Sequence, residues 1–220
     1  MGRLLDSAAR LANTAWYQWR RNNWLLYPPR LFRSFDSVPI DRPVFFVGNQ
    51  GGGLTLVSRM IRRHPDLVSI SGGGDYWSGA DEMQKVANLR LPPSLVLGGR
   101  WFGGGDPPHE RLTPPRGWSY ASDDLFAWYR KTEEDASEDD ARALKRVIRE
   151  SLHRFGRHSR APRFVDKSQV FAIKMRYVEA LLSDANPFFV LVTRDPYASV
   201  YRAATKTEDM VRYARSMSLD

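Results

Sequence analysis

The 220-residue chain is long enough for one sizeable domain with an apolar core, since 42% of its residues are hydrophobic and 12% are aromatic. This composition excludes an intrinsically disordered chain. The formal net charge of +8 and the pI of 9.9 favour an anionic partner, which is a phosphorylated cofactor, an acidic substrate, nucleic acid or a membrane surface. The absence of cysteine excludes disulfides, thiolate catalysis and Cys-ligated zinc, and the four histidines form no metal-ligand pattern, so no metal site is expected.

Residues 1–42 are predicted to be a helical extension and a linker, and residues 43–220 the main domain. Residues 3–22 have the pattern of an amphipathic helix whose apolar positions are Leu4, Leu5, Ala8, Leu11, Ala12 and Ala15. The same segment carries Trp16, Trp19, Arg20 and Arg21, with Trp24 just beyond. Such a helix packs on the domain, contacts a partner or lies in a membrane interface, and the first two are favoured. No stretch approaches the about 20 apolar residues of a membrane span, and no signal-peptide core is present, so a cytoplasmic location is expected.

Strands and helices alternate through the main domain. The predicted strands are residues 44–47, 67–70, 163–166 and 188–193, the last of them expected to be buried. The predicted helices are residues 54–64, 138–155 and 171–183, with Ser137 as the N-cap of the second. Residues 91–118, rich in Pro and Gly, are predicted to be a long functional loop. The alternation predicts an α/β fold: a three-layer sandwich with a parallel sheet and a P-loop-like nucleotide-binding topology.

Residues 48–55, Gly-Asn-Gln-Gly-Gly-Gly-Leu-Thr, have the glycine spacing of a P-loop, but Leu54 stands at the lysine position. A nucleotide triphosphatase uses that lysine to neutralise the transferring phosphate, so nucleotide hydrolysis is disfavoured. The backbone N–H groups of the loop and the positive end of the following helix still suit a phosphate group. The alternative is a glycine-rich turn that only joins a strand to a helix.

Further basic residues follow two other predicted strands. Arg194 begins an Arg-Asp-Pro sequence after residues 188–193, and its planar guanidinium suits two phosphate oxygens. Lys167 follows residues 163–166. Because open α/β sheets bind ligands at the carboxyl ends of their strands, both side chains are expected near the glycine loop. The alternatives are an ion pair between Arg194 and Asp195 and a solvated Lys167.

Four segments in order resemble the sulfotransferases that use 3'-phosphoadenosine 5'-phosphosulfate (PAPS), especially the bacterial and tyrosylprotein-type branches. They are PVFFVGNQGGGLTLVSRM, RRHPDLVSISGGGDYW, FVDKSQVFAIKMRYVEALLSDAN and FFVLVTRDPYASVYRA. The resemblance covers residues 43–205 and implies transfer of a sulfuryl group from PAPS to an acceptor hydroxyl or amine without a metal. It implies a 5'-phosphosulfate site at Gly51, Gly52, Gly53, Leu54 and Thr55. It assigns the 3'-phosphate to Arg194 and Arg202, and stabilisation of the transferring and leaving groups to Lys167.

The segments also depart from the family pattern. Gly51 stands where the family has Arg or Lys, and Arg202 stands where it usually has Ser. The chain ends shortly after Arg215, where relatives continue, so the C-terminal part is expected to be incomplete. The predicted general base is Asp75, with Glu82 in reserve.

Four functions follow in order of preference: a sulfotransferase, a non-catalytic sulfotransferase-like nucleotide-binding protein, a P-loop kinase and a nucleic-acid-binding protein. No sequence-specific nucleic-acid motif is present. The acceptor is a small molecule, glycan or peptide, and Trp101, Phe102 and Trp118 are candidates to line its pocket.

Overall fold

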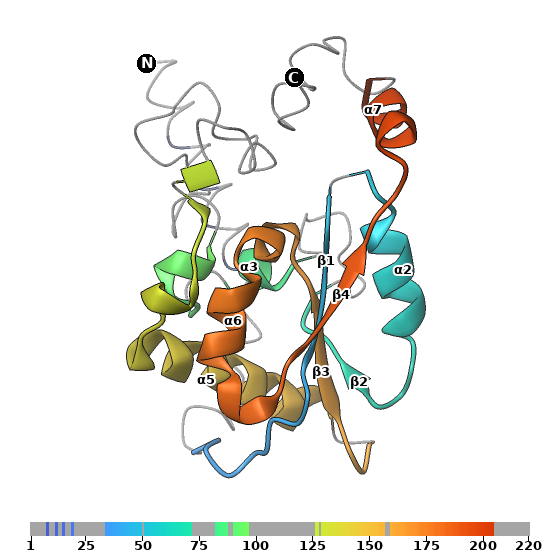
Figure 1. The fold of residues 1–220 in the computed structure, drawn as a ribbon. Helices are drawn as coiled ribbons and strands as arrows, with labels where there is room; N and C mark the ends of the chain where they lie inside the picture. Colours follow the sequence, from blue (N-terminus) through green and yellow to red (C-terminus); the bar gives the residue numbers. More distant parts are fainter. Residues whose placement is uncertain are drawn as a thin grey trace.

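The fold, taken from a computed structural model, is built around a four-stranded sheet (Figure 1). The structure describes residues 34–49, 51–71, 82–87, 90–96, 126–127, 129–156 and 159–204, together with residues 8, 12, 15 and 19. The strands are β1 (Val44–Gly48), β2 (Leu67–Val68), β3 (Arg163–Lys167) and β4 (Phe188–Val192). They lie in the order β2-β3-β1-β4, and every pair is parallel. This arrangement confirms the expected α/β fold with a parallel sheet.

The central strand is β1, which pairs with β3 on one side and with β4 on the other. Val44 lies opposite Val165 of β3 and Phe188 of β4, and Gly48 lies opposite Val192. The strand is made of β-branched and aromatic residues, which suit a pleated surface packed on both sides. All four strands therefore end at the same edge of the sheet.

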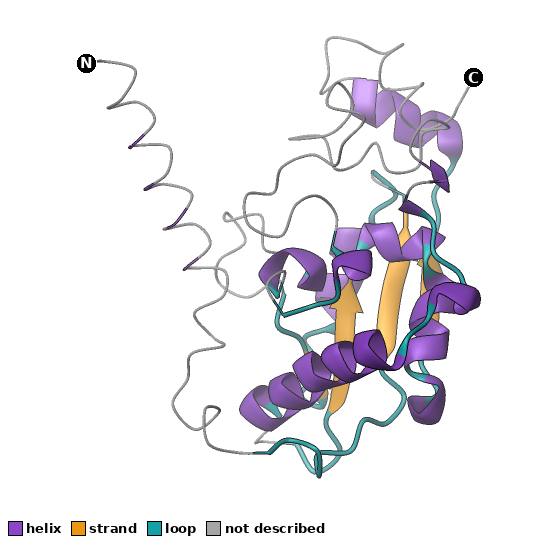
Figure 2. Ribbon diagram, turned by 90° about the vertical axis from the view of Figure 1, so that its left-hand side faces the viewer, coloured by secondary structure: helices purple, strands orange, loops and turns teal. Residues whose placement is uncertain are grey.

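Helices cover both faces of the sheet (Figure 2). The α-helices are α2 (Leu54–Ile61), α3 (Met83–Val86), α5 (Glu138–Phe155), α6 (Met175–Leu181) and α7 (Pro196–Ala204). The short 3₁₀ helices are Pro93–Leu95, Glu133–Asp135, Gln169–Ile173 and Ser183–Ala185. Among the described residues, no helix has both the length and the apolar character to cross a bilayer.

The side chains of β1 alternate between two apolar clusters. Phe45 packs into the larger cluster with Ile148 of α5 and Val178 of α6. Phe46 points to the other face and packs with Leu54 of α2. The sheet is thus enclosed by α5 and α6 on one face and by α2 on the other, which gives the expected three layers.

Helix α5 illustrates how local sequence fixes an element. The Ser137 hydroxyl accepts a hydrogen bond from the Asp140 N–H at 3.2 Å, which caps the first turn, and three acidic residues favour the positive end of the helix dipole. One face is buried through Leu144 and Val147, and the helix ends at Gly156. The cap and the helix bounds match the prediction.

The N-terminal extension is described at only a few positions before residue 34. Ala8, Ala12, Ala15 and Trp19 are helical, as predicted. The predicted linker, residues 34–42, is attached to the domain: the Phe35 ring is 5% exposed, with its centroid 5.1 Å from that of a histidine on α5.

Three predicted elements differ from the structure. Strand β4 was expected to be buried, yet Phe188 and Leu191 are 50% and 61% exposed, because β4 pairs only with β1 in the part of the chain that the structure describes. The helix expected over residues 171–183 begins as a 3₁₀ turn, breaks at Lys174 and continues as α6. Lys174 takes a non-helical conformation there, and its Nζ donates to the Ser94 carbonyl at 2.5 Å. Strand β2 is also shorter than predicted.

Candidate functional site

The loop after β1 is closely packed against the end of β4. Gly48 and Gly53 have φ of 155° and 90°. A Cβ on Gly48 would lie 2.2 Å from the Val192 carbonyl oxygen, so a larger residue would push the two strand ends apart. Gly52 is buried, and its N–H donates to the Asn49 carbonyl at 3.2 Å. The glycines therefore bring this loop against the strand that leads to Arg194.

Helix α2 begins directly after the loop. Its N-cap, Gly53, is in the left-handed conformation and supplies no side-chain cap, and the first turn contains no acidic residue. The first N–H groups of an α-helix have no partner within the helix, so this end presents donors and positive potential. The Leu54 side chain is 2% exposed and packs with Phe46 and Val165. Leu54 can therefore contribute only its backbone to a ligand, whereas Thr55 is half-buried beside it.

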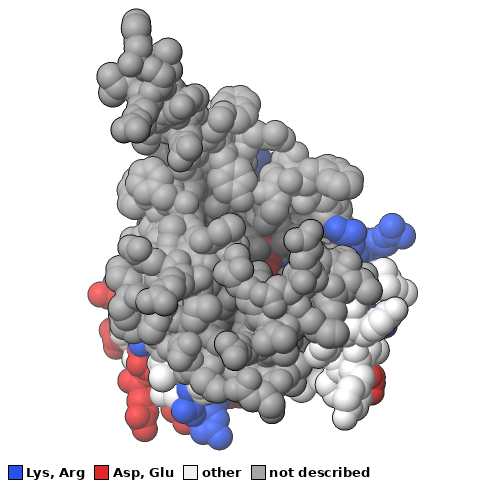
Figure 3. Space-filling model, turned by 90° about the horizontal axis from the view of Figure 1, so that it is seen from above, with Lys and Arg blue, Asp and Glu red and all other residues white. Residues whose placement is uncertain are grey.

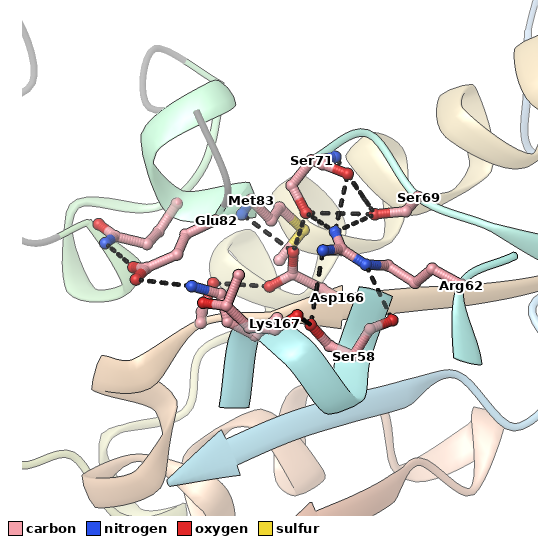
Figure 4. Close-up of polar contacts among 11 residues, drawn as sticks. Ser58, Arg62, Ser69, Ser71, Glu82, Met83, Asp166 and Lys167 are labelled. Atoms are coloured by element: carbon pink, nitrogen blue, oxygen red, sulfur yellow. Dashed lines mark hydrogen bonds and ion pairs between the residues drawn. The ribbon is translucent and has the colours of Figure 1, made fainter. Parts of the chain in front are cut away.

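Lys167 ends β3 and lies opposite Phe46, two residues before the glycine loop begins. Its side chain is 1% exposed, and its Nζ lies 3.5 Å from Oε1 of Glu82, which is also buried (Figure 4). The Gln84 amide donates to the other carboxylate oxygen of Glu82 at 2.7 Å. Because a buried charge is costly unless it is paired, the two side chains hold each other in place. The solvated Lys167 considered as an alternative is wrong.

Asp166 joins three segments of this edge. One carboxylate oxygen accepts from the Ser71 hydroxyl at 3.0 Å and from the Met83 N–H at 2.9 Å, and the other accepts from the Ser168 hydroxyl at 2.6 Å. Burial raises the pKa of Asp166, against the hydrogen bonds from Ser168 and Ser71 and the charge of Arg62, which lower it. Met83 directly follows Glu82. The hydrogen bond from the Met83 N–H to Asp166 therefore also helps to position the Glu82 carboxylate, which faces Lys167.

Arg62 supports the same region from the C-terminal end of α2. Its guanidinium donates to the Ser71 carbonyl at 2.8 Å and to the Ser69 hydroxyl at 3.3 Å, and its Nε donates to the Ser58 carbonyl (Figure 4). These bonds tie the segment after β2 to α2. No role was predicted for Arg62, because a single arginine near the end of a helix belongs to no recognisable motif.

Arg194 lies just beyond the end of β4 and is exposed. In the part of the chain that the structure describes, no carboxylate forms an ion pair with Arg194. Asp195 is used elsewhere: its carboxylate accepts from the Ala198 N–H at 2.8 Å and caps α7. The alternative pairing of Arg194 with Asp195 is therefore not formed, and the Arg194 guanidinium is available to an anion.

The glycine loop, the Lys167–Glu82 pair and Arg194 thus lie at the carboxyl ends of three adjacent strands. The loop follows the central strand, and the two basic residues follow its neighbours on either side. Figure 3 looks down on this edge and shows basic side chains projecting at one side. An anion entering here would meet the backbone N–H groups at the start of α2 and the exposed guanidinium of Arg194, whereas Lys167 lies buried against Glu82.

Several predicted site residues lie outside the described residues. These are Asp75, the predicted base, and the predicted pocket residues Trp101, Phe102 and Trp118. Arg202 belongs to α7, but its side chain is outside the described part of the chain. The predicted loop over residues 91–118 is described only at its beginning, where Leu91 and Leu95 are fully buried in the core.

Comparison with protein-family models, curated proteins and solved structures finds no match to this chain. Among the described residues, no group of three or more His, Asp or Glu side chains is arranged to hold a metal ion.

Proposed function

We propose that this chain is a sulfotransferase that moves a sulfuryl group from PAPS to an acceptor hydroxyl or amine by in-line transfer. The proposal rests on three features at three adjacent strand ends. They are a glycine loop followed by a helix without a side-chain cap, the buried Lys167–Glu82 pair, and Arg194, which has no ion-pair partner among the described residues. A donor with two separated phosphate-type groups needs two anion sites on one edge, and this edge offers a candidate for each. The sequence resemblance to PAPS-dependent enzymes gives the same assignment.

The glycine loop suits the 5'-phosphosulfate. A Cβ on Gly48 would collide with the backbone of β4, so the loop keeps a tight form, and the first N–H groups of α2, which have no partner within the helix, can bind an anion. Gly51, Gly52 and Gly53 have no side chain to obstruct that anion, and Thr55 can add a hydroxyl. Neither Gly51 nor Leu54 brings a cation, so the cationic contribution falls to Lys167.

Arg194 is the candidate ligand of the 3'-phosphate. It is exposed, it lies two residues after Val192, and its neighbour Asp195 is already bonded to the first turn of α7. A planar guanidinium binds two phosphate oxygens at once. Arg202, two turns further along α7, is the second candidate for this phosphate.

Lys167 and Glu82 are the candidate catalytic pair. We infer that Lys167 exchanges its contact with Glu82 for oxygens of the sulfuryl group and of the leaving phosphate, where negative charge increases during transfer. Glu82 then accepts the proton of the acceptor hydroxyl. A bond forms between the acceptor oxygen and sulfur, the bond from sulfur to the 5'-phosphate oxygen breaks, and the phosphate keeps that electron pair. Asp75 is kept as the alternative base.

A catalytically inactive nucleotide-binding protein is the second candidate. The specific observation in its favour is the cation-free loop, because Leu54 is held in the apolar core and Gly51 has no side chain. The same burial of Leu54 disfavours a kinase, since the position of the P-loop lysine faces the core.

Titration calorimetry with PAP and PAPS, followed by transfer of labelled sulfate to phenol, sugar and tyrosine-peptide acceptors, tests the proposal. Binding of both nucleotides with transfer to one acceptor class is expected. Binding without transfer to any acceptor would favour the inactive alternative. Failure of PAP to bind would refute both, and ATP hydrolysis would favour a kinase.

A further inference from the structure

The N-terminal segment has an apolar face that the proposed transfer reaction does not use. On an α-helix of about 3.6 residues per turn, eight of its apolar residues fall within an arc of about 140°. They are Leu4, Leu5, Ala8, Leu11, Ala12, Ala15, Trp16 and Trp19, whereas Ala9 and Tyr17 lie outside that arc. The opposite side of the same helix carries Asp6, Arg10, Asn13, Thr14, Arg20 and Arg21. The sequence therefore defines one apolar face and one basic polar face.

The structure describes four residues at the centre of that apolar face. Ala8, Ala12, Ala15 and Trp19 are all helical, and all four are exposed. Trp19 is 54% exposed. The centre of the apolar face is therefore not covered by the rest of the protein. An apolar helix face left in water is unfavourable, so an external partner is expected.

The charge of the segment indicates which partner suits it. Residues 1–33 contain six arginines and one aspartate, which gives a net +5 of the chain's total +8. Trp16, Trp19 and Trp24 lie within nine residues, and tryptophan prefers the boundary between headgroups and acyl chains. A membrane surface that contains anionic lipid matches both the basic face and the apolar face.

A protein partner fits the pattern less well. A coiled-coil partner would need an apolar repeat sustained over three or four heptads, whereas the apolar face here covers only residues 4–19. The polar residues between the apolar ones also prevent the helix from spanning a bilayer, so it would lie in the plane of the interface.

We propose that residues 3–22 form an in-plane helix that binds an anionic lipid surface, with the face around Ala12 and Trp19 in the acyl boundary and the arginines at the headgroups. The helix would attach the domain reversibly to that surface. This inference stands independently of the sulfotransferase proposal, since it uses none of the residues at the carboxyl edge of the sheet.

Sedimentation of the full chain with vesicles tests the proposal. Vesicles of phosphatidylcholine with phosphatidylglycerol are expected to bind the chain at least about tenfold more tightly than vesicles of phosphatidylcholine alone. Added salt should weaken the binding, because it screens the arginines. Trp fluorescence should shift to shorter wavelength with the anionic vesicles only.

Two neighbouring substitutions separate insertion from simple charge attraction. Ala12→Glu and Asn13→Glu add the same charge to the same helix, but on opposite faces. Ala12→Glu is expected to weaken vesicle binding about tenfold or more, and Asn13→Glu only a few-fold. Circular dichroism and an unchanged unfolding midpoint would show that both variants keep the folded domain.

Three results would overturn the proposal. The first is no binding of the wild-type chain to anionic vesicles. The second is an equal loss for the two substitutions, which would mean that the apolar face does not insert. The third is a dimer in solution that Ala12→Glu converts to a monomer without any change in vesicle binding, which would identify a second copy of the chain as the partner.

Discussion

The two neighbours of β1 differ in what surrounds their carboxyl ends. At the end of β3, Asp166 and Lys167 are almost completely buried, and each is bonded to segments from elsewhere in the chain. At the end of β4, Leu191 is 61% exposed and Arg194 is open to solvent. One half of the candidate site is thus assembled by the fold itself, and the other half is available to a ligand.

This difference separates two roles that basic residues can have at a strand end. A buried charge loses its hydration and needs fixed partners, so it contributes to folding as well as to chemistry. An exposed charge contributes little to stability and is free to bind. We therefore expect changes on the β3 side to alter stability and transfer together, and changes on the β4 side to alter binding alone.

The largest effect is expected for Lys167→Met. Transfer should fall by at least about 10³-fold, which corresponds to about 4 kcal/mol. The reason is that the glycine loop itself has no cationic side chain to stabilise the leaving phosphate in place of Lys167. The unfolding midpoint should also fall, since the Glu82 carboxylate loses its ion-pair partner in a buried site. Initial rates with labelled PAPS and urea unfolding measure the two effects.

Two further variants sharpen that test. Lys167→Met combined with Glu82→Gln is expected to recover stability but not transfer. Lys145→Met is the matched control. Lys145 lies on α5, and its Nζ pairs at 2.8 Å with a carboxylate oxygen of Asp184, which is not part of the candidate site. Transfer by Lys167→Met at the rate of this control would contradict the assignment of Lys167.

The next effect concerns the contact between the loop and β4. Gly48→Ala should destabilise the fold by about 3 kcal/mol, because its Cβ would lie 2.2 Å from the Val192 carbonyl oxygen. Gly53→Ala is the matched control, since it also has a positive φ, of 90°, but a Cβ there meets no atom within 4 Å. It should cost only about 1 kcal/mol. Equal urea midpoints for the two variants would mean that the loop is not held against β4.

A smaller effect is expected on the open side. Arg194→Ala should weaken PAP binding by about 30-fold, or about 2 kcal/mol, without changing the unfolding midpoint. Arg194→Lys should restore part of the affinity, because it returns the charge but not the planar pair of donors. Calorimetry gives both dissociation constants. An unchanged affinity in Arg194→Ala would remove Arg194 from the site.

The smallest effect is a change in pH dependence caused by Asp166. Burial raises its pKa above the ordinary value of 3.8, so the folded state holds this proton more tightly than the unfolded state. The resulting stability is complete below the unfolded pKa and is lost as pH rises through the folded pKa. Compared with Asp166→Asn, which lacks this titration, the wild type should lose unfolding free energy as the pH rises above 3.8. Parallel pH profiles for the two proteins would contradict the raised pKa.

Elements with strong local signals could be predicted from the sequence. The apolar run before Gly48 predicted β1, and Ser137 with the acidic residues after it predicted the start of α5. Such signals act within one turn or one strand, and tertiary contacts did not override them. The basic residues that follow two apolar runs likewise predicted that Lys167 and Arg194 lie at or just beyond the carboxyl ends of their strands.

The contacts that organise the site could not be predicted in this way. Lys167 meets Glu82 across a separation of 85 residues, and nothing in either local sequence specifies the other. The apolar run of β4 also gave no information on how many neighbours the strand has, so its exposure was missed. The break at Lys174 was missed because its hydrogen bond to the Ser94 carbonyl joins residues that are 80 positions apart in the sequence.

The parallel pairing of β1 has a consequence for synthesis of the chain. Val44 pairs with Val165 and Phe188, so the central strand leaves the ribosome long before either partner has been made. Until then Phe45 and Phe46 have no sheet to join, and their unpaired backbone is open to association with other nascent chains. Expression yield should therefore respond more to chaperone supply and slower translation than the stability of the finished protein would suggest.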